Sequence, residues 1–221
     1  MKYKLIIILF VLFLTLIFQA KGAASVHQAY SSNEHVLAKR EMSLDKRYDN
    51  KFVNDVFKDN ILLTLGFLSG DVTDPKKIHW DKVRADSRYE VVLKPGDVFA
   101  FHDDVMSSYK GKHLVTTHAH FNAGEGFKSD GYLVGDGVCH FASLINWAAR
   151  DAGLNVVAPT NHNFAHIPEV PREYGTAIYY LPGSSSANEM QNLYVENMFD
   201  NPVRLVFRYA QNILSVTIYK S

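Results

Sequence analysis

The stretch from Gly135 to Gly153 constrains the fold most strongly, because it joins a glycine-rich turn to a helical pattern and contains the only cysteine, Cys139. Glycine adopts the left-handed conformation without steric cost, so Gly153 is a natural helix end. Cys139 is therefore expected in the first turn of a helix, where free N–H groups and the helix dipole favour a thiolate. Apolar residues at helical spacing predict one buried stripe, formed by Phe141, Leu144, Ile145, Ala148 and Ala152.

The N-terminus has the pattern of a secretory signal. Lys2 and Lys4 precede an apolar run over residues 5–18, and small residues follow at 22–25. Because this run is shorter than the ~20 residues that span a bilayer, we expect residues 1–24 to be a cleaved signal peptide, with a retained membrane anchor as the alternative. The remaining chain is then exported, either periplasmic or extracellular in the cell wall. A single cysteine in an exported protein cannot form an internal disulfide.

The charge balance argues against several classes of ligand. Acidic and basic residues number 23 each, and no basic stripe indicates nucleic-acid binding. Asp136 would repel a phosphate at the glycine-rich turn. His118 and His120 form an H-x-H pair, which alone is weak evidence for a metal. The sequence therefore predicts no cofactor, no metal and no nucleic-acid partner, with membrane contact only through residues 5–18.

Hydrophobic patterning predicts one α+β domain over residues 49–221, mostly antiparallel sheet with the cysteine-bearing helix and an N-terminal covering helix. Residues 25–48 are polar and suggest a linker or a weakly helical arm. The covering helix is expected over 49–69. Alternation predicts a hairpin over 88–102 and a second one that joins 204–209 to 213–219. Single strands are expected at 114–121, 155–158, 176–181 and 193–196.

Cysteine acyl-transfer chemistry needs a thiolate, an imidazole within hydrogen-bond reach and donors for the oxyanion. His162 is the preferred base, because it lies in a loop that can return to the start of the cysteine helix. His140 points about 100° away from Cys139 on a helix and is a poorer base. The third catalytic member stays open between Asn122, Asn161 and Asn197, by residue type alone. Further residues expected to line the site are His140, His118, His120, Gly135, Asp136, Gly137, Ser143 and Asn161.

Four segments in order give the chain a resemblance to VanW-like domains, covering about residues 88–220. Residues 94–101 resemble the family's K-P-G-E-x-F-S-F-N, and residues 135–143 resemble its signature G-G-G-(I/V)-C-Q-x-S-S. Residues 161–164 are similar to N-H-S-F, with the following V-P at 170–171. Residues 193–202 are similar to the closing L-x-x-x-N-x-(S/T)-x-x-P. The chain departs from the signature at Asp136, His140 and Ala142, which replace a glycine, the glutamine and a serine.

The resemblance implies a bacterial cell-envelope protein of a family named from glycopeptide-resistance clusters. Family members are assigned L,D-transpeptidase activity on peptidoglycan, with the signature cysteine as nucleophile. By that analogy Cys139 would attack the carbonyl after the third stem-peptide residue and release D-Ala. The thioester would then pass to an amine of a neighbouring stem, and His162 matches the family histidine. Peptidoglycan stem peptides are the partners that this implies.

Two other function classes compete with acyl transfer. An NlpC-like or CHAP-like cysteine peptidase or amidase also starts a helix with its cysteine, although such enzymes usually have an aspartate just before it, where this chain has Val138. A cell-wall or peptide-binding module with a structural cysteine is the non-enzymatic alternative.

Overall fold

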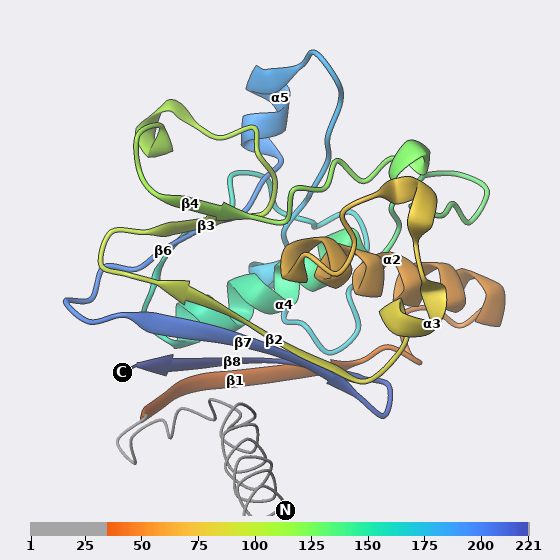
Figure 1. Cartoon of the computed structure of the whole chain (residues 1–221), viewed down its shortest axis with the longest axis horizontal. Coiled ribbons are helices and arrows are strands. Elements are labelled where there is room, and N and C mark those ends of the chain that lie inside the picture. The colour runs from red at the N-terminus through yellow and green to blue at the C-terminus, as the bar shows by residue number, and fades with distance from the viewer. Residues whose placement is uncertain (1–34, 221) are drawn as a thin grey trace, which may run out of the picture. The chain divides into compact units, whose positions relative to one another are not determined.

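The computed structural model describes residues 35–220, whose helices and two sheets confirm the predicted α+β class. The expected signal or anchor over 1–24 lies outside the described residues. Between residues 35 and 220, no helix combines the length and apolarity needed to cross a membrane. The elements (Figure 1) are β1 His35–Ser43, α2 Lys51–Ser69, α3 Trp80–Val83, β2 Ser87–Leu93, β3 Val98–Ala100, β4 Leu114–Thr116, α4 Val138–Asp151, β5 Asn155–Val157, α5 Ser185–Met190, β6 Tyr194–Glu196, β7 Val203–Ala210 and β8 Ile213–Lys220.

The larger sheet is antiparallel throughout, with the strand order β1-β8-β7-β2. Its centre is the β7–β8 hairpin, which confirms the second predicted hairpin. Gln211 and Asn212 form the two-residue turn, and both have positive φ, 51° and 62°. Such a turn matches the right-handed twist of the flanking strands and fixes their register.

The smaller sheet has the order β4-β3-β6-β5, and only its β3–β4 pair is parallel. The predicted hairpin over 88–102 is wrong, because β2 pairs with β7 in the larger sheet whereas β3 pairs with β6 here. Hydrogen bonds at the turn over residues 94–97 explain why β2 and β3 enter different sheets. The N–H of Gly96 donates to the carbonyl of Asn197, and the Asp97 carboxylate accepts from the N–H of Lys94. The chain is thus directed to the end of β6 instead of back along β2.

Residues 35–43 are a strand where a polar linker was expected. β1 pairs with β8 over its whole length, and Ala38 and Met42 face the core. The alternation was hidden in the sequence because three charged residues, at positions 39–41, lie between these two. Successive side chains of a strand point to opposite faces, so a half-buried edge strand needs apolar residues only at every second position.

Two predicted strands are shorter or absent. The strand expected over 114–121 ends at Thr116, because His118 and Phe121 both have a φ of 57°, which extended pairing does not permit. Residues 176–181 join neither sheet. They instead run along α4, as described below for the candidate site.

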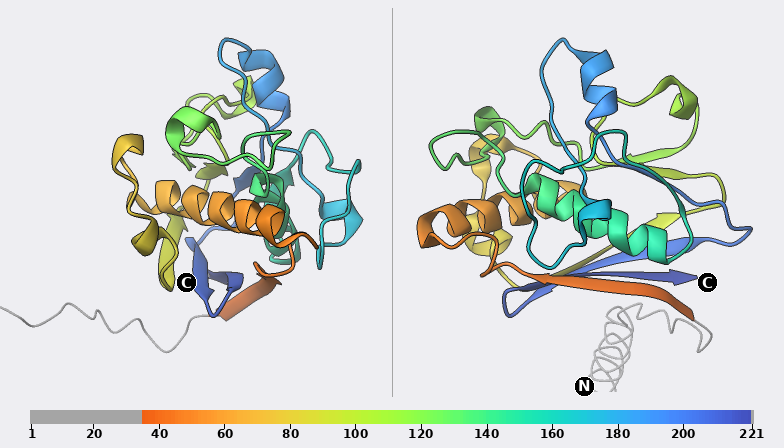
Figure 2. Two further views of the ribbon diagram at one scale, coloured as in Figure 1. Left: turned by 90° about the vertical axis from the view of Figure 1, so that its right-hand side faces the viewer. Right: turned by 180° about the vertical axis from the view of Figure 1, so that it is seen from behind.

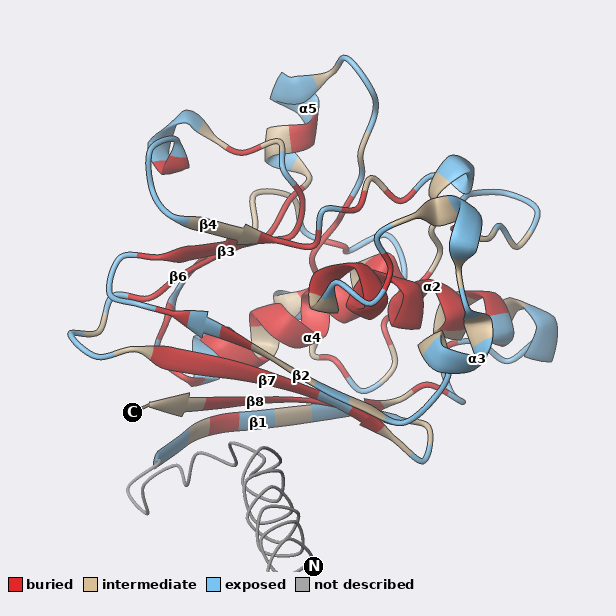
Figure 3. Cartoon of the chain, in the orientation of Figure 1, coloured by how far each residue is buried: buried red, intermediate tan, exposed pale blue. Residues whose placement is uncertain are grey.

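The cysteine-bearing helix α4 lies between the two sheets and confirms the predicted helix (Figures 1 and 2). Its predicted apolar stripe is buried, and α4 is among the most buried elements of the fold (Figure 3). The Phe141 ring packs edge-on against Phe101, which follows β3, and against Phe207 of β7, at 5.9 and 5.7 Å between centroids. Phe141 thereby joins both sheets to α4.

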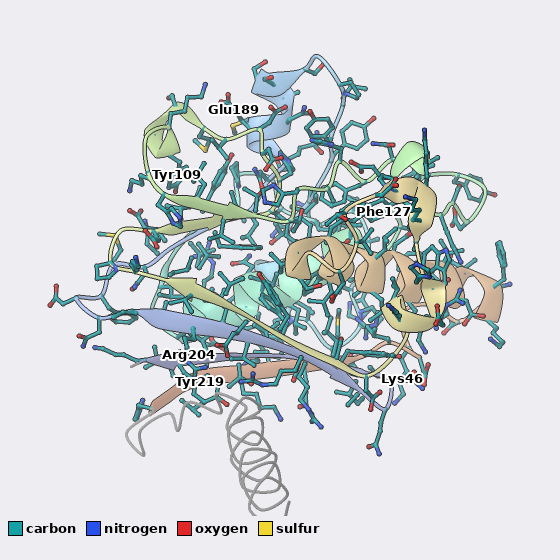
Figure 4. All side chains as sticks on the ribbon, viewed as in Figure 1. Lys46, Tyr109, Phe127, Glu189, Arg204 and Tyr219 are labelled. Carbon is teal, nitrogen blue, oxygen red and sulfur yellow. The ribbon has the colours of Figure 1, made fainter. Side chains whose placement is uncertain are left out.

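The covering helix is confirmed as α2, which packs beside α4. Asn50 caps its start by accepting from the N–H groups of Phe52 and Val53, and Gly70 ends it in the left-handed conformation. Phe127, labelled in Figure 4, is buried and stacks on Phe67 of α2 with ring centroids 6.0 Å apart. These contacts fix α2 in the core, and its residues 57–60 lie against the start of α4.

The assignment of β1 to the folded unit can be tested with Met42→Ala. Met42 is 1 % exposed, so its truncation should lower the free energy of unfolding by about 2–4 kcal/mol. Lys39→Ala, at an exposed position of the same strand, is the matched control and should change it by less than about 0.5 kcal/mol. Urea denaturation measures both values. If both substitutions changed the free energy of unfolding by the same small amount, residues 35–43 would be a linker and not a strand of the folded unit.

Candidate active site

The start of α4 is pressed against the backbone of α2. Gly137 caps α4 with a φ of 96°, and a Cβ at this position would lie 2.6 Å from the carbonyl oxygen of Phe57. Gly135 has a φ of 90°, and its Cβ would lie 3.1 Å from the carbonyl oxygen of Phe121. The two glycines before the cysteine are therefore required by both conformation and space. Any side chain at Gly137 would push the helix start away from α2.

Asn60 of α2 fixes the loop that leads into the cysteine helix. Its side-chain amide donates to the carbonyl of Asp136 at 2.9 Å and to that of Lys128 at 3.0 Å, and its oxygen accepts from the N–H of Lys128 at 2.8 Å. Asn60 is fully buried, so these bonds are shielded from water. Both ends of the loop 128–136 are thus tied to one side chain.

Cys139 lies in the first turn of α4, as predicted, and its thiol contacts the backbone of Ile178. Sγ accepts from the Ile178 N–H at 3.3 Å and donates to the Ile178 carbonyl at 3.5 Å. One and two turns further along α4, Ser143 accepts from the N–H of Thr176 and Asn146 donates to the carbonyl of Tyr174, both at 2.9 Å. This row of side chains replaces a sheet partner for residues 174–178.

Ser143, expected to line the site, therefore has a different position. Its hydroxyl is buried below the thiol, where it donates to the carbonyl of Cys139 at 2.7 Å. It supports the extended segment beside Cys139 and does not line the cleft.

A cleft of about 340 Å³ opens over Cys139. It is lined by the predicted Gly135, Asp136, Gly137, His140 and His162. Apolar side chains supply most of the remaining wall, among them Phe57 of α2 and the exposed Phe164, Tyr132 and Tyr179. A largely apolar cleft with a few polar groups at its base is typical of a ligand-binding site.

The imidazoles of His140 and His162 are both buried in this cleft, with ring centroids 6.2 Å apart. The Phe57 ring packs edge-on against His140, and the Phe164 ring is tilted against His162 with ring centroids 4.0 Å apart. Burial, together with the charge of Arg47, lowers the pKa of His140 to about 3. Burial also lowers the pKa of His162. Both rings are therefore neutral at pH 7.

The thiol is neutral as well, which overturns the prediction that the helix start favours a thiolate. Burial raises the pKa of Cys139 to about 11; the hydrogen bond from Ile178 opposes this rise, and the charge of Asp136 adds to it. Burial also raises the pKa of Asp136 itself to about 6, and the charge of Asp130 contributes. The resting site thus contains a thiol and two neutral imidazoles instead of a thiolate–imidazolium pair.

Several predicted site residues lie elsewhere. His118 is exposed beside Thr116 and Asp103, and His120 binds Glu125 at 2.9 Å, so neither lines the cleft. The three asparagines considered as a third catalytic member are also engaged away from it. Asn161 donates to the carbonyl of Arg172, Asn122 caps residues 123–125, and Asn197 holds the turn after β6. Among residues 35–220, no three His, Cys, Asp or Glu side chains gather in a way that could hold a metal ion.

Two contributors to the cleft were missed by sequence reasoning. The guanidinium of Arg47 is buried in its wall, where it pairs with Glu169 at 2.5 Å and donates to the carbonyl of Pro168 at 3.2 Å. Arg47 lies in the stretch expected to be a linker, so its charge suggested only a solvated surface. Ile178 acts through its backbone, which leaves no signal in side-chain chemistry.

Comparison with known proteins gives a family-level result. The family model described as VanW like protein matches residues 82–219. No curated protein and no solved structure matches the chain. The matched range includes α4, the two buried histidines of the cleft and every strand except β1, apart from the last residue of β8. Phe57, Asn60 and Arg47 belong to the preceding part of the chain, which therefore completes the cleft from outside that range.

The contact between α4 and α2 predicts an unusually large effect of Gly137→Ala. The substitution combines left-handed strain with a clash against backbone, and should lower the free energy of unfolding by about 3 kcal/mol or more. Gly111→Ala is the matched control, because Gly111 has a φ of 92° and nothing within 4 Å of its Cβ position. Its cost should be about 1 kcal/mol, from strain alone. Equal costs by thermal or urea denaturation would contradict the close approach to Phe57.

The raised pKa of Cys139 predicts slow alkylation. At pH 8 iodoacetamide should modify Cys139 about a hundredfold more slowly than a free cysteine, with a rate that rises up to about pH 11. Asp136→Asn removes a negative charge, lowers the pKa of the thiol and should speed alkylation severalfold above pH 6, where Asp136 is ionised. Asp81→Asn, at an exposed site outside the cleft, should have no effect. A midpoint at or below about pH 8.5 would contradict the buried neutral thiol.

Proposed function

Since this chain belongs to the VanW-like family, we propose that it is an exported cysteine acyltransferase that acts on the stem peptides of peptidoglycan. The observation that carries the proposal is the shared cleft, in which the Cys139 thiol at the start of α4 and the imidazoles of His140 and His162 lie together. Export is inferred from the apolar run over residues 5–18 and the basic residues before it.

Attack on a substrate requires general-base catalysis, because thiol and imidazole are both neutral at rest. As a carbonyl approaches Sγ, an imidazole takes the thiol proton and the C–S bond forms. His140, with a pKa of about 3, holds a proton too weakly for this role. His162 also lies in an irregular segment after β5, which allows its ring to follow the substrate. We therefore assign the base to His162.

Backbone N–H groups beside Sγ can stabilise the oxyanion. The N–H of Ile178 lies 3.3 Å from Sγ, and the N–H of Cys139 itself also favours negative charge at this point. Preorganised donors of this kind contribute about 3 kcal/mol each to acyl transfer. The segment 174–178 is held in place by Ser143 and Asn146, so the Ile178 donor is fixed before substrate arrives.

The second half of the reaction decides between transfer and hydrolysis. The protonated His162 gives its proton to the leaving amine, here D-Ala, and the acyl group stays on Sγ as a thioester. An amine of a neighbouring stem then displaces the thiol and forms the cross-link. The apolar walls supplied by Phe57 and Phe164 favour an amine on a peptide over water at this point.

A peptide-binding module with a structural cysteine is the second candidate. The observation in its favour is the thiol itself, whose pKa is raised to about 11 and whose Sγ is engaged with both backbone groups of Ile178. A hydrolase of the NlpC or CHAP kind would use the same cysteine and differ only in its products.

Product analysis separates these functions. Incubated with muropeptides, the protein should give cross-linked dimers, which mass spectrometry distinguishes from the shortened monomers of a hydrolase. Cys139→Ala should remove the activity, and His162→Asn should lower kcat by about 10²–10⁴-fold. His118→Asn, an exposed histidine outside the cleft, is the control and should retain full activity. Full activity of the Cys139→Ala variant would exclude Cys139 as the nucleophile. Binding of muropeptides without turnover would support the peptide-binding module.

A further inference from the structure

The cleft contains polar atoms that no part of the described chain satisfies. Asp136 Oδ2, His140 Nδ1 and His162 Nδ1 are buried, line the cleft and have no hydrogen-bond partner among residues 35–220. Only 5 % of His140 and 6 % of His162 is exposed. Leaving a buried polar atom without a partner destabilises the protein, so three such atoms in one cleft point to a ligand that pairs with them.

These atoms are suited to a hydrogen-bond donor. The carboxylate of Asp136 can only accept. A neutral imidazole with its proton on Nε2 accepts at Nδ1, and both histidines are neutral at pH 7 because burial lowers each pKa. The ligand that satisfies all three atoms is therefore rich in N–H donors and needs no acceptor of its own.

The charge around the cleft also favours a cation. Arg47 is the only lysine or arginine among the described residues of its lining, and Glu169 neutralises it. Asp130 and Asp136 also line the cleft, and neither has a lysine or arginine partner in that lining. Lys128, at the base of the same loop, is engaged with Asp59 of α2 instead. The side of the cleft formed by Asp130 and Asp136 thus has a net negative charge.

Asp136 cannot turn away from Cys139 at low cost, because Asn60 holds its backbone carbonyl and Gly137 beside it is pressed onto Phe57. The Asp136 carboxylate raises the pKa of the neighbouring thiol, and burial raises the pKa of the carboxyl group itself. A cation bound beside Asp136 would lower the pKa of the thiol and the pKa of the Asp136 carboxyl group together. This accounts for a buried acid that otherwise disfavours the nucleophile.

We propose that the Asp136 side of the Cys139 cleft is a subsite for a primary ammonium group. A primary ammonium has three N–H donors and one positive charge, which match the acceptors and the charge of this side. The inference rests on the proposed acyl transfer for its role there, in which this group is the attacking amine of the acceptor stem peptide.

In that role the amine must lose a proton before it attacks. One ammonium proton passes through a cleft imidazole to solvent, and the nitrogen lone pair forms the new C–N bond. The C–S bond of the thioester breaks, and the departing sulfur takes a second proton from nitrogen. The products are an amide and the free thiol of Cys139, so atoms and charge balance without any further reactant.

Binding of a small cation tests the subsite without turnover. In the full chain carrying Cys139→Ala, at low salt, NMR titration would compare Nα-acetyl-lysine methylamide with its neutral Nε-acetylated analogue. We expect the ammonium probe to bind at least about tenfold more tightly, with Asp136→Asn removing this preference. Asp81→Asn is the control for loss of one exposed acid outside the cleft and should preserve it. Equal affinities, a preference that survives Asp136→Asn, or tighter binding of acetylglycine would overturn the subsite.

The proposed function can fail separately from the subsite. Acyl transfer requires a thioester on Cys139 of the wild-type chain, whereas the probe is bound by a chain that lacks the thiol. Probe binding without any thioester would leave the ammonium subsite standing and remove acyl transfer. A thioester on Cys139 without probe binding would support acyl transfer and remove the ammonium subsite.

Discussion

The close approach of Gly137 to the backbone of Phe57 is the contact on which the rest of the site depends. It fixes where α4 begins relative to α2, and Phe141 then holds the same helix between both sheets. The contact also brings the Phe57 ring against His140 and places Asn60 where it binds the loop before the cysteine. A single glycine therefore links the packing of the core to the geometry of the cleft.

Burial outweighs the helix dipole in setting the state of Cys139. A helix start stabilises a negative charge by about 0.3–1 kcal/mol, whereas the rise of the pKa from 9.0 to about 11 corresponds to about 3 kcal/mol. Under the proposed function, the neutral thiol would give up its proton only when a substrate is present. Fixed groups around it, the Ile178 backbone and two buried imidazoles, can act at that moment without first being reorganised.

Periodicity was sufficient to predict α2, α4 and the β7–β8 hairpin, because each buries a regular apolar pattern. Cys139 could be placed in the first turn of α4 for the same reason, and His162 in its cleft because its loop can return to that helix start and because it matches the family histidine. The failures lie where tertiary contacts override local pattern. The turn at Gly96 joins two sheets, and in the strand predicted over 176–181 the backbone of Thr176 and Ile178 bonds to side chains of α4 instead. The pKa of Cys139 depends on burial, which a local motif does not encode.

The central claim is that Cys139 carries the acyl group of a stem peptide. Intact-mass measurement after acid quenching tests it most directly, with the full chain incubated with a tetrapeptide stem that ends in D-Ala. The account predicts an adduct equal to the acyl tripeptide, located on Cys139 and absent from the Cys139→Ser variant. Turnover of the peptide with no adduct at Cys139, or the same adduct on the variant, would contradict it.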